Sequence, residues 1–197
     1  MNFIFNRILA NFNEEFLNEI NECRVNPSNY ARKIEEYLQY VKPNPEPKPG
    51  ANFLFIFLNY PKISLSKGKE AFTECINELN KIKPMHPLKN VLMLNLTVPT
   101  TSDNWVKKQI VSNMILHKKD EVLNKYDILQ FHYDIGGLNP VIMAMLQIID
   151  DNITFNMTRR KNLLDDDFNS IGISNYNIGK KVCVYLLFGK SVPVPES

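Results

Sequence analysis

One stretch of the chain is the most diagnostic for its fold: Asn156-Met157-Thr158-Arg159-Arg160-Lys161-Asn162-Leu163-Leu164. Two arginines and a lysine stand side by side there. A long apolar segment precedes them, and an alternating segment follows. A guanidinium group is a planar fork of N–H donors, which suits carboxylates and backbone carbonyls. We therefore expect this basic cluster to pair with acidic side chains or carbonyl groups nearby.

A helix is predicted before this stretch. Asn139 is a favourable N-cap residue, and Pro140 suits the first helical position. Apolar residues then recur at helical spacing as far as Ile149, and Asp150-Asp151 ends the pattern. The basic cluster therefore follows a helix after a short connection.

Two more helices are predicted near the N-terminus. Asn13 can cap a helix with one apolar face, which Asn26-Pro27 ends. Ser28 or Asn29 can cap a second helix, whose apolar stripe we expect to pack in the core. Residues 1–12 form an N-terminal arm in this interpretation. Its apolar part, Phe3 to Leu9, either docks on a partner or packs on its own domain.

Prolines alternate with polar residues from Lys42 to Gly50, a pattern that removes backbone donors and favours a loop acting as a spacer. We place this Pro-rich loop at residues 42–51. Strands are expected over 52–58 and 62–65, where aromatic and branched residues dominate. Ser66 can cap the next helix, which ends before Lys83-Pro84.

Composition limits the alternatives. The 197 residues, 44% of them hydrophobic, suit a single domain over 13–190 with a tail at 191–197. The 23 basic and 21 acidic residues nearly balance, which argues against dedicated nucleic-acid binding. Three distant cysteines suit neither a disulfide framework nor a metal site. The first ten residues lack the apolar run of a secretory signal and no segment is long enough for a bilayer, so an intracellular protein is expected.

The run Arg160-Lys161-Asn162 with two leucines after it resembles the Gly-His-Arg-Lys-Asn signature of the CAP superfamily, the cysteine-rich secretory, antigen 5 and pathogenesis-related (SCP-like) proteins. Further matches follow the order typical of CAP-like proteins of protists and plants: Arg24-Val25-Asn26-Pro27, Tyr30-Ala31-Arg32-Lys33-Ile34-Glu35, Gly68-Lys69-Glu70-Ala71 and Pro87-Leu88. The resemblance covers nearly the whole chain.

This resemblance implies a three-layer α/β/α sandwich with a central, mostly antiparallel sheet. Residues 168–174 and 182–188 would supply its closing antiparallel strands. Because the family retains the Arg-Lys-Asn part of its signature even where other residues vary, the resemblance also implies a structural role for Arg160, Lys161 and Asn162.

The resemblance further implies a cleft where two histidines and two acidic residues converge, in some members around a cation such as zinc. Arg159 stands at one histidine position, and an arginine has no lone pair to give to a metal. Phe131 stands at the glutamate position, and residues 97–104, where the second histidine is expected, contain none. The prediction is a degenerate cleft without metal, cofactor or catalytic residue, with vestigial positions at Phe131, His132, Asp134 and Arg159.

His132 and Asp134 leave an alternative open. Two residues apart on a strand, they would share one face, where the carboxylate could orient the imidazole for acid/base work in a hydrolase-like enzyme. No nucleophile or third metal ligand is evident beside them, so a structural or partner-contact role is preferred. His86 and His117 are expected in turns or at the surface, and Trp105 in a helix that packs in the core.

The sequence thus predicts a non-catalytic CAP-like domain that acts as an intracellular protein-binding or scaffold subunit, in an assembly such as a cytoskeletal or ciliary complex. The second interpretation is a secreted or vesicular CAP protein that binds lipid or sterol between its helices. The third is the enzyme that uses His132 and Asp134.

Overall fold

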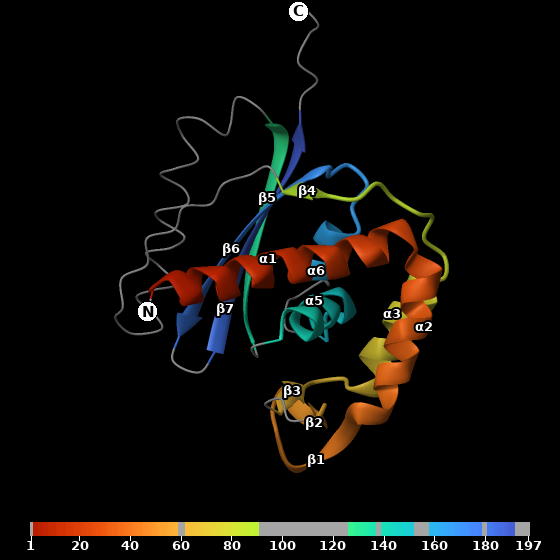
Figure 1. Cartoon of the computed structure of the whole chain (residues 1–197). Coiled ribbons are helices and arrows are strands. Elements are labelled where there is room, and N and C mark those ends of the chain that lie inside the picture. The colour runs from red at the N-terminus through yellow and green to blue at the C-terminus, as the bar shows by residue number, and fades with distance from the viewer. Residues whose placement is uncertain are drawn as a thin grey trace, which may run out of the picture.

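Two sheets and a set of helices make up the chain, which is a mixed α/β protein (Figure 1). The computed structural model describes residues 2–58, 62–90, 126–136, 139–151, 158–178 and 181–191. The predicted Trp105 helix lies outside these residues. Within them, a single cluster of buried side chains draws on all the longer helices and on both sheets.

The first helix is longer than the sequence predicts. Helix α1 spans Asn2–Val25, so residues 2–12 belong to it and Asn13 lies inside the helix rather than at its start. Residues 2–12 contain neither Gly nor Pro, so nothing local interrupts the helix. The Asn13 side chain serves a tertiary contact instead: its Nδ2 donates to the Ile173 carbonyl at 3.3 Å, and its Oδ1 accepts from Asn175 Nδ2 at 2.5 Å.

The second helix, α2, spans Pro27–Tyr37, and a short 3-10 turn, η1, follows at Leu38–Tyr40. The cap is Asn26, not Ser28 or Asn29 as predicted. Its side chain accepts from the Asn29 backbone N–H at 3.2 Å. Pro27 takes the first helical position, where its missing N–H costs nothing. The same Asn-Pro pair therefore ends α1 and starts α2.

The Pro-rich segment is a strand, which corrects the predicted loop. Strand β1 spans Val41–Lys48 and pairs antiparallel with β2, Ala51–Phe55, which pairs in turn with β3, Ile63–Leu65. The strand order β1-β2-β3 places β1 at an edge, where a proline interrupts no inter-strand ladder on its outer side. The two strands predicted after it are confirmed, apart from their ends.

The third helix, α3, spans Lys69–Leu79 and packs against α2. Ser66 is not its cap, because Gly68 holds that position with φ +60°. The backbone N–H groups of Ser66, Lys67 and Gly68 all donate to the Asp151 side chain. The Asp151 carboxylate, distant in the sequence, therefore accepts hydrogen bonds before α3, where a Ser66 hydroxyl was expected to cap the helix.

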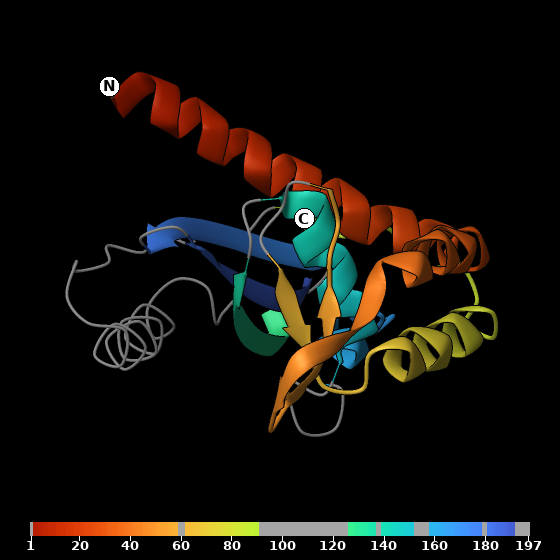
Figure 2. The same ribbon diagram turned by 90° about the horizontal axis from the view of Figure 1, so that it is seen from below.

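The four-stranded sheet has the order β4-β6-β7-β5. Its strands are β4 (Lys89–Asn90), β5 (Tyr126–Gly136), β6 (Ser170–Ile178) and β7 (Lys181–Ser191). β7 pairs antiparallel with both β5 and β6, while β4 runs parallel to β6. The antiparallel strands predicted near 168–174 and 182–188 are confirmed. Helix α1 lies along this sheet, as the perpendicular view shows (Figure 2), and contacts β6.

Helix α5, Pro140–Ile149, confirms the helix predicted before the basic stretch. Asn139 caps it by accepting from the Ile142 N–H at 2.8 Å. It ends at Asp150, whose left-handed backbone (φ 49°) turns the chain away. Helix α6, Thr158–Leu163, carries the basic residues themselves. Because α5 packs against α1, α3 and α6, the basic stretch lies at the centre of the helical layer.

The core consists largely of the apolar stripes predicted from helical spacing. Phe16, Ile20 and Cys23 of α1 and Tyr30 and Ile34 of α2 are completely buried. Full burial of one such aliphatic or aromatic side chain contributes about 1.5–3 kcal/mol. This packing fixes the helices against the sheet and so positions the buried arginines.

Candidate functional site

The basic stretch forms helix α6, whose start is held by Asp150. The Asp150 Oδ2 atom accepts from the backbone N–H groups of Arg159 at 3.1 Å and Arg160 at 3.4 Å. A carboxylate at this end of a helix meets N–H groups that have no partner within the helix. The Asp150 side chain thus links the end of α5 to the start of α6.

Arg160 joins three elements through a buried guanidinium. Its Nε donates to the Ile148 carbonyl at 2.8 Å, its Nη2 donates to the Ile149 carbonyl, and its Nη1 lies 2.8 Å from Glu78 Oε2. The side chain is 1% exposed, whereas Glu78 is 46% exposed. The carbonyls belong to the last turn of α5, which leaves C=O groups unsatisfied. Arg160 therefore fastens α6 to the end of α5 and to α3.

The three signature residues differ in environment. Arg160 and Asn162 are buried, while Lys161 is exposed. Arg159 is also buried, at 5% exposure. The cluster therefore packs within the fold except at Lys161.

Arg24 is a second buried clamp. Its guanidinium donates to four carbonyls: His86 at 2.9 Å, Leu163 at 2.8 Å, Asp165 at 3.0 Å and Phe168 at 2.9 Å. Burial lowers the pKa of Arg24, and the nearby carboxylates of Asp166 and Asp165 act in the opposite direction. The clamp ties the end of α1 to the loop that follows α6. The sequence motif Arg24-Val25-Asn26-Pro27 did not reveal these carbonyl contacts of Arg24.

Asp151 receives three backbone N–H groups from the segment between β3 and α3. Oδ1 accepts from Lys67 at 2.9 Å and Gly68 at 3.1 Å, and Oδ2 accepts from Ser66. Burial raises the pKa of Asp151, and the three N–H donors lower it. Asp150 and Asp151, which the sequence analysis treated only as a helix end, thus organise the two flanking segments.

Phe131, His132 and Asp134 lie in β5, where the backbone register pairs them with Leu187, Leu186 and Val184 of β7. Their side chains lie outside the described part of the structure, as do His117 and residues 97–104. Whether the vestigial positions converge with Arg159 therefore stays a prediction. His86 is exposed in an irregular segment, as expected, and Asp166 and Asp167 form an exposed turn. Within the described ranges, no group of three His, Cys, Asp or Glu side chains could hold a metal ion.

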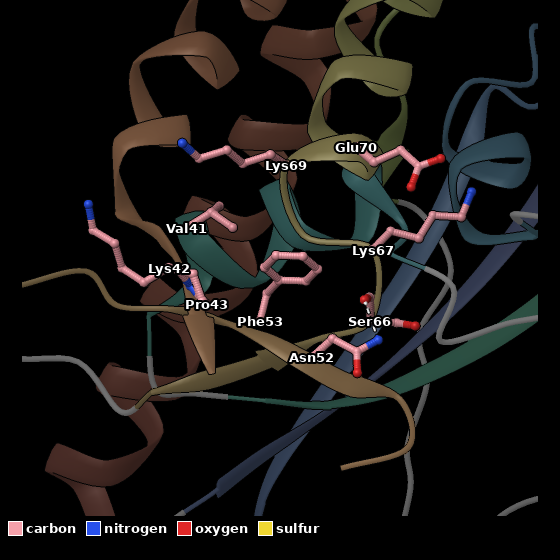
Figure 3. Close-up of a pocket in the computed structure, with 9 residues that line it drawn as sticks. All are labelled: Val41, Lys42, Pro43, Asn52, Phe53, Ser66, Lys67, Lys69 and Glu70. Carbon is pink, nitrogen blue, oxygen red and sulfur yellow. Dashed lines mark hydrogen bonds between the residues drawn. The ribbon is translucent and has the colours of Figure 1, made fainter. Parts of the chain in front are cut away.

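An open cavity of about 740 Å³ lies beside the three-stranded sheet, and the sequence analysis did not find it (Figure 3). Its walls come from β1, β2 and the start of α3: Val41, Lys42, Pro43, Asn52, Phe53, Ser66, Lys67, Lys69 and Glu70. The half-buried Phe53 ring stands in the middle. No local pattern reveals this cavity, because it depends on how α3 sits over the β1–β2 pair.

Gly68 allows this arrangement. A Cβ atom at Gly68 would lie 2.5 Å from Phe53 Cγ, well inside van der Waals contact. The φ of +60° is also a conformation that side chains disfavour. Gly68, noted in the sequence only as part of a motif, therefore permits close contact between the start of α3 and the Phe53 ring.

The charges around the cavity are uneven. Lys67 Nζ lies 3.1 Å from the Glu74 carboxylate, which neutralises it. Lys42 and Lys69 are exposed and have no carboxylate partner among the residues that the structure describes. One wall of the cavity is therefore positively charged and solvent-accessible.

No family model, curated protein or solved structure matches this chain. The relation to the CAP superfamily consequently depends on the residues quoted above and is taken up as a proposal below. In the described part of the chain, no helix combines the length and the apolar character needed to cross a membrane.

Proposed function

We propose that this chain is a CAP/SCP-like domain, a three-layer α/β/α sandwich with a degenerate cleft, that acts as a non-catalytic protein-binding or scaffold subunit of an intracellular assembly. The observation that carries this proposal is that some basic side chains are buried in structural contacts while others stay exposed to solvent. The signature arginine Arg160 is consumed by buried structural contacts, whereas Lys42 and Lys69 are exposed around an open cavity.

The buried contacts of Arg160 favour a structural role for the signature. Arg160 donates to two carbonyls and pairs with Glu78, so its guanidinium is committed to the fold. Asp150, at the end of α5, accepts from the start of α6. In this reading the region that serves as a metal cleft elsewhere in the superfamily is here a junction between helices.

The second motif that resembles the family supports the CAP-like fold. Arg24, from Arg24-Val25-Asn26-Pro27, donates to the carbonyl of Leu163 in the basic stretch. Two motifs separated by most of the chain thus contact each other directly. A chance resemblance at two unrelated places gives no reason for such a contact, whereas a shared fold does.

Buried thiols favour the intracellular setting. Cys23 and Cys75 are both free and completely buried. Free thiols persist in reducing compartments, where disulfides are rare. A cytoskeletal or ciliary complex remains the setting that we propose from the sequence.

In-cell crosslinking mass spectrometry with subcellular fractionation tests this proposal. We expect reproducible crosslinks from lysines of this chain to another protein, and recovery in a large intracellular complex. Recovery as a free secreted protein, with crosslinks only within the chain, would refute the scaffold role. Stoichiometric zinc in the purified protein would separately refute the degenerate cleft.

A further inference from the structure

We propose that the cavity between β1, β2 and α3 binds a short acidic segment of a partner protein, which places an apolar side chain on Phe53 and carboxylates against Lys42 and Lys69. This inference deepens the proposed function and rests on it, because it names the surface that a partner uses and the chemistry of that partner. Three observations support it: the apolar side chains that line the cavity, the lack of free backbone donors on β1 beside it, and the positions of the charged side chains.

The centre of the cavity is apolar. Phe53 is half-buried, the exposed Pro43 adds apolar surface on β1, and the buried Val41 lies beside them. Phe53 also lies against Gly68, so its ring is held from one side by the start of α3. An aromatic ring fixed in this way offers a flat surface on which an aliphatic or aromatic side chain of a partner can pack.

The partner's backbone cannot pair with residues 41–43 of β1 as another strand. The Ile56 N–H donates to the Tyr40 carbonyl at 2.9 Å, which places this pair in the hydrogen-bonded register. Because such pairs alternate, Val41 and Pro43 point their backbone groups away from β2, toward the open edge. The Val41 N–H is already taken by the Leu38 carbonyl, and Pro43 has none. No backbone donor is therefore free on this part of the open edge, residues 41–43, and recognition beside Phe53 uses side chains.

The exposed lysines beside the cavity favour an acidic partner segment. Figure 3 shows the side chains of Lys42 and Lys69 on one side of the Phe53 ring and those of Lys67 and Glu70 on the other. Lys67 is neutralised by Glu74, and the exposed Glu70 carboxylate lies on that same side, whereas Lys42 and Lys69 keep their charge exposed on the opposite side. Two cations beside an aromatic ring complement a segment that carries carboxylates next to an apolar residue.

A protein segment suits this surface better than a membrane does. The chain carries 23 basic against 21 acidic residues, so no large excess of positive charge supports attraction to an anionic bilayer. The cationic groups instead flank a single ring, which requires a ligand whose charges and apolar group are closely spaced. Acidic peptides provide that spacing along one chain.

The test is a fluorescence-anisotropy titration of the full chain with a labelled peptide in which glutamate and leucine alternate. We expect saturable binding that weakens with added salt. The double variant Lys42→Gln/Lys69→Gln should weaken it roughly 2- to 30-fold, the range for two exposed ion pairs. The matched control is Lys81→Gln/Lys161→Gln, which removes the same charge from exposed positions away from the cavity and should leave binding unchanged.

Three results would overturn the inference. The first is equal binding of a peptide in which lysine replaces glutamate, and the second is an equal loss in both double variants. The third is binding to vesicles of phosphatidylserine and phosphatidylcholine that depends on Lys42 and Lys69 while the acidic peptide does not bind. If in-cell crosslinks to a partner arise only from lysines outside the cavity, this inference fails but the proposed function stands. If no partner is crosslinked at all, the proposed function itself fails.

Discussion

The substitution Arg160→Met tests whether the basic stretch holds the helices together. Methionine keeps an unbranched apolar side chain, shorter than that of arginine, and removes all the N–H donors. The Ile149 carbonyl would then lie in the interior without this donor, and the Ile148 carbonyl would keep only the weak Cys75 thiol donor at 3.6 Å. Water does not reach them easily because Arg160 is 1% exposed. Glu78, at 46% exposure, can return to solvent.

The expected cost follows from these contacts. A buried acceptor left without its donor costs about 1–3 kcal/mol, so the two carbonyls together give about 2–6 kcal/mol. Loss of the pair with the half-exposed Glu78 adds about 0–1 kcal/mol. We expect a net loss near 4 kcal/mol, which corresponds to a fall of roughly 8–16 °C in melting temperature for a chain of this size.

Thermal and urea unfolding, followed by circular dichroism, measure this loss. Lys161→Met is the matched control, because Lys161 is the next residue of the same helix and is exposed. Its effect should stay within about 0.5 kcal/mol. If Arg160→Met and Lys161→Met shift the melting temperature equally, the structural role of the signature is wrong.

Three further predictions concern other parts of the fold. Arg24→Met should lower the free energy of unfolding by about 2–6 kcal/mol in urea, because the buried Leu163 and Phe168 carbonyls lose their donor. Arg32 is exposed, so Arg32→Met is the control, and an equal effect of the two variants would contradict this prediction. Gly68→Ala should lower the free energy of unfolding by about 1–3 kcal/mol, more than Gly50→Ala does, since both glycines have positive φ but only Gly68 lies against a side chain. Equal urea midpoints for the two variants would show that the Phe53 ring moves aside at no cost. Burial raises the pKa of Cys75 from 9.0 to about 12, so the folded state holds its proton more tightly than the unfolded state and stability should fall as pH rises through that interval. Urea midpoints over this range should fall less in Cys75→Ala, and identical slopes would exclude the effect.

Several elements follow from local chemistry and were predictable. Asn139 and Pro140 start α5 because one accepts a hydrogen bond from the first turn and the other fits its first position. The closing strands follow from runs of residues that suit a pleated sheet. Such signals are contained in a few neighbouring residues, so no tertiary contact is needed to read them.

The errors arose where distant residues replaced local partners. Asn13 is a favourable cap by composition, yet its side chain bonds to Ile173 and Asn175 of β6 while α1 continues through it. Ser66 has the right side chain for a cap, yet the Asp151 carboxylate receives its N–H. The alternating prolines read as a loop because the edge position of β1, which tolerates them, is decided by the sheet and not by the segment.

The sequence by itself determined most of the longer helices, the two strands after the Pro-rich segment and the closing strands, together with the unusual basic stretch at residues 159–161. It also determined that Arg159 lacks the lone pair of a metal ligand. Only the tertiary structure decided what the basic residues do. Arg160 and Arg24 became buried clamps because packing of α1, α3, α5 and α6 placed unsatisfied carbonyls within reach of them. Lys42 and Lys69 stayed exposed beside Phe53 because two segments far apart in the chain meet there, and no short-range pattern records such a meeting.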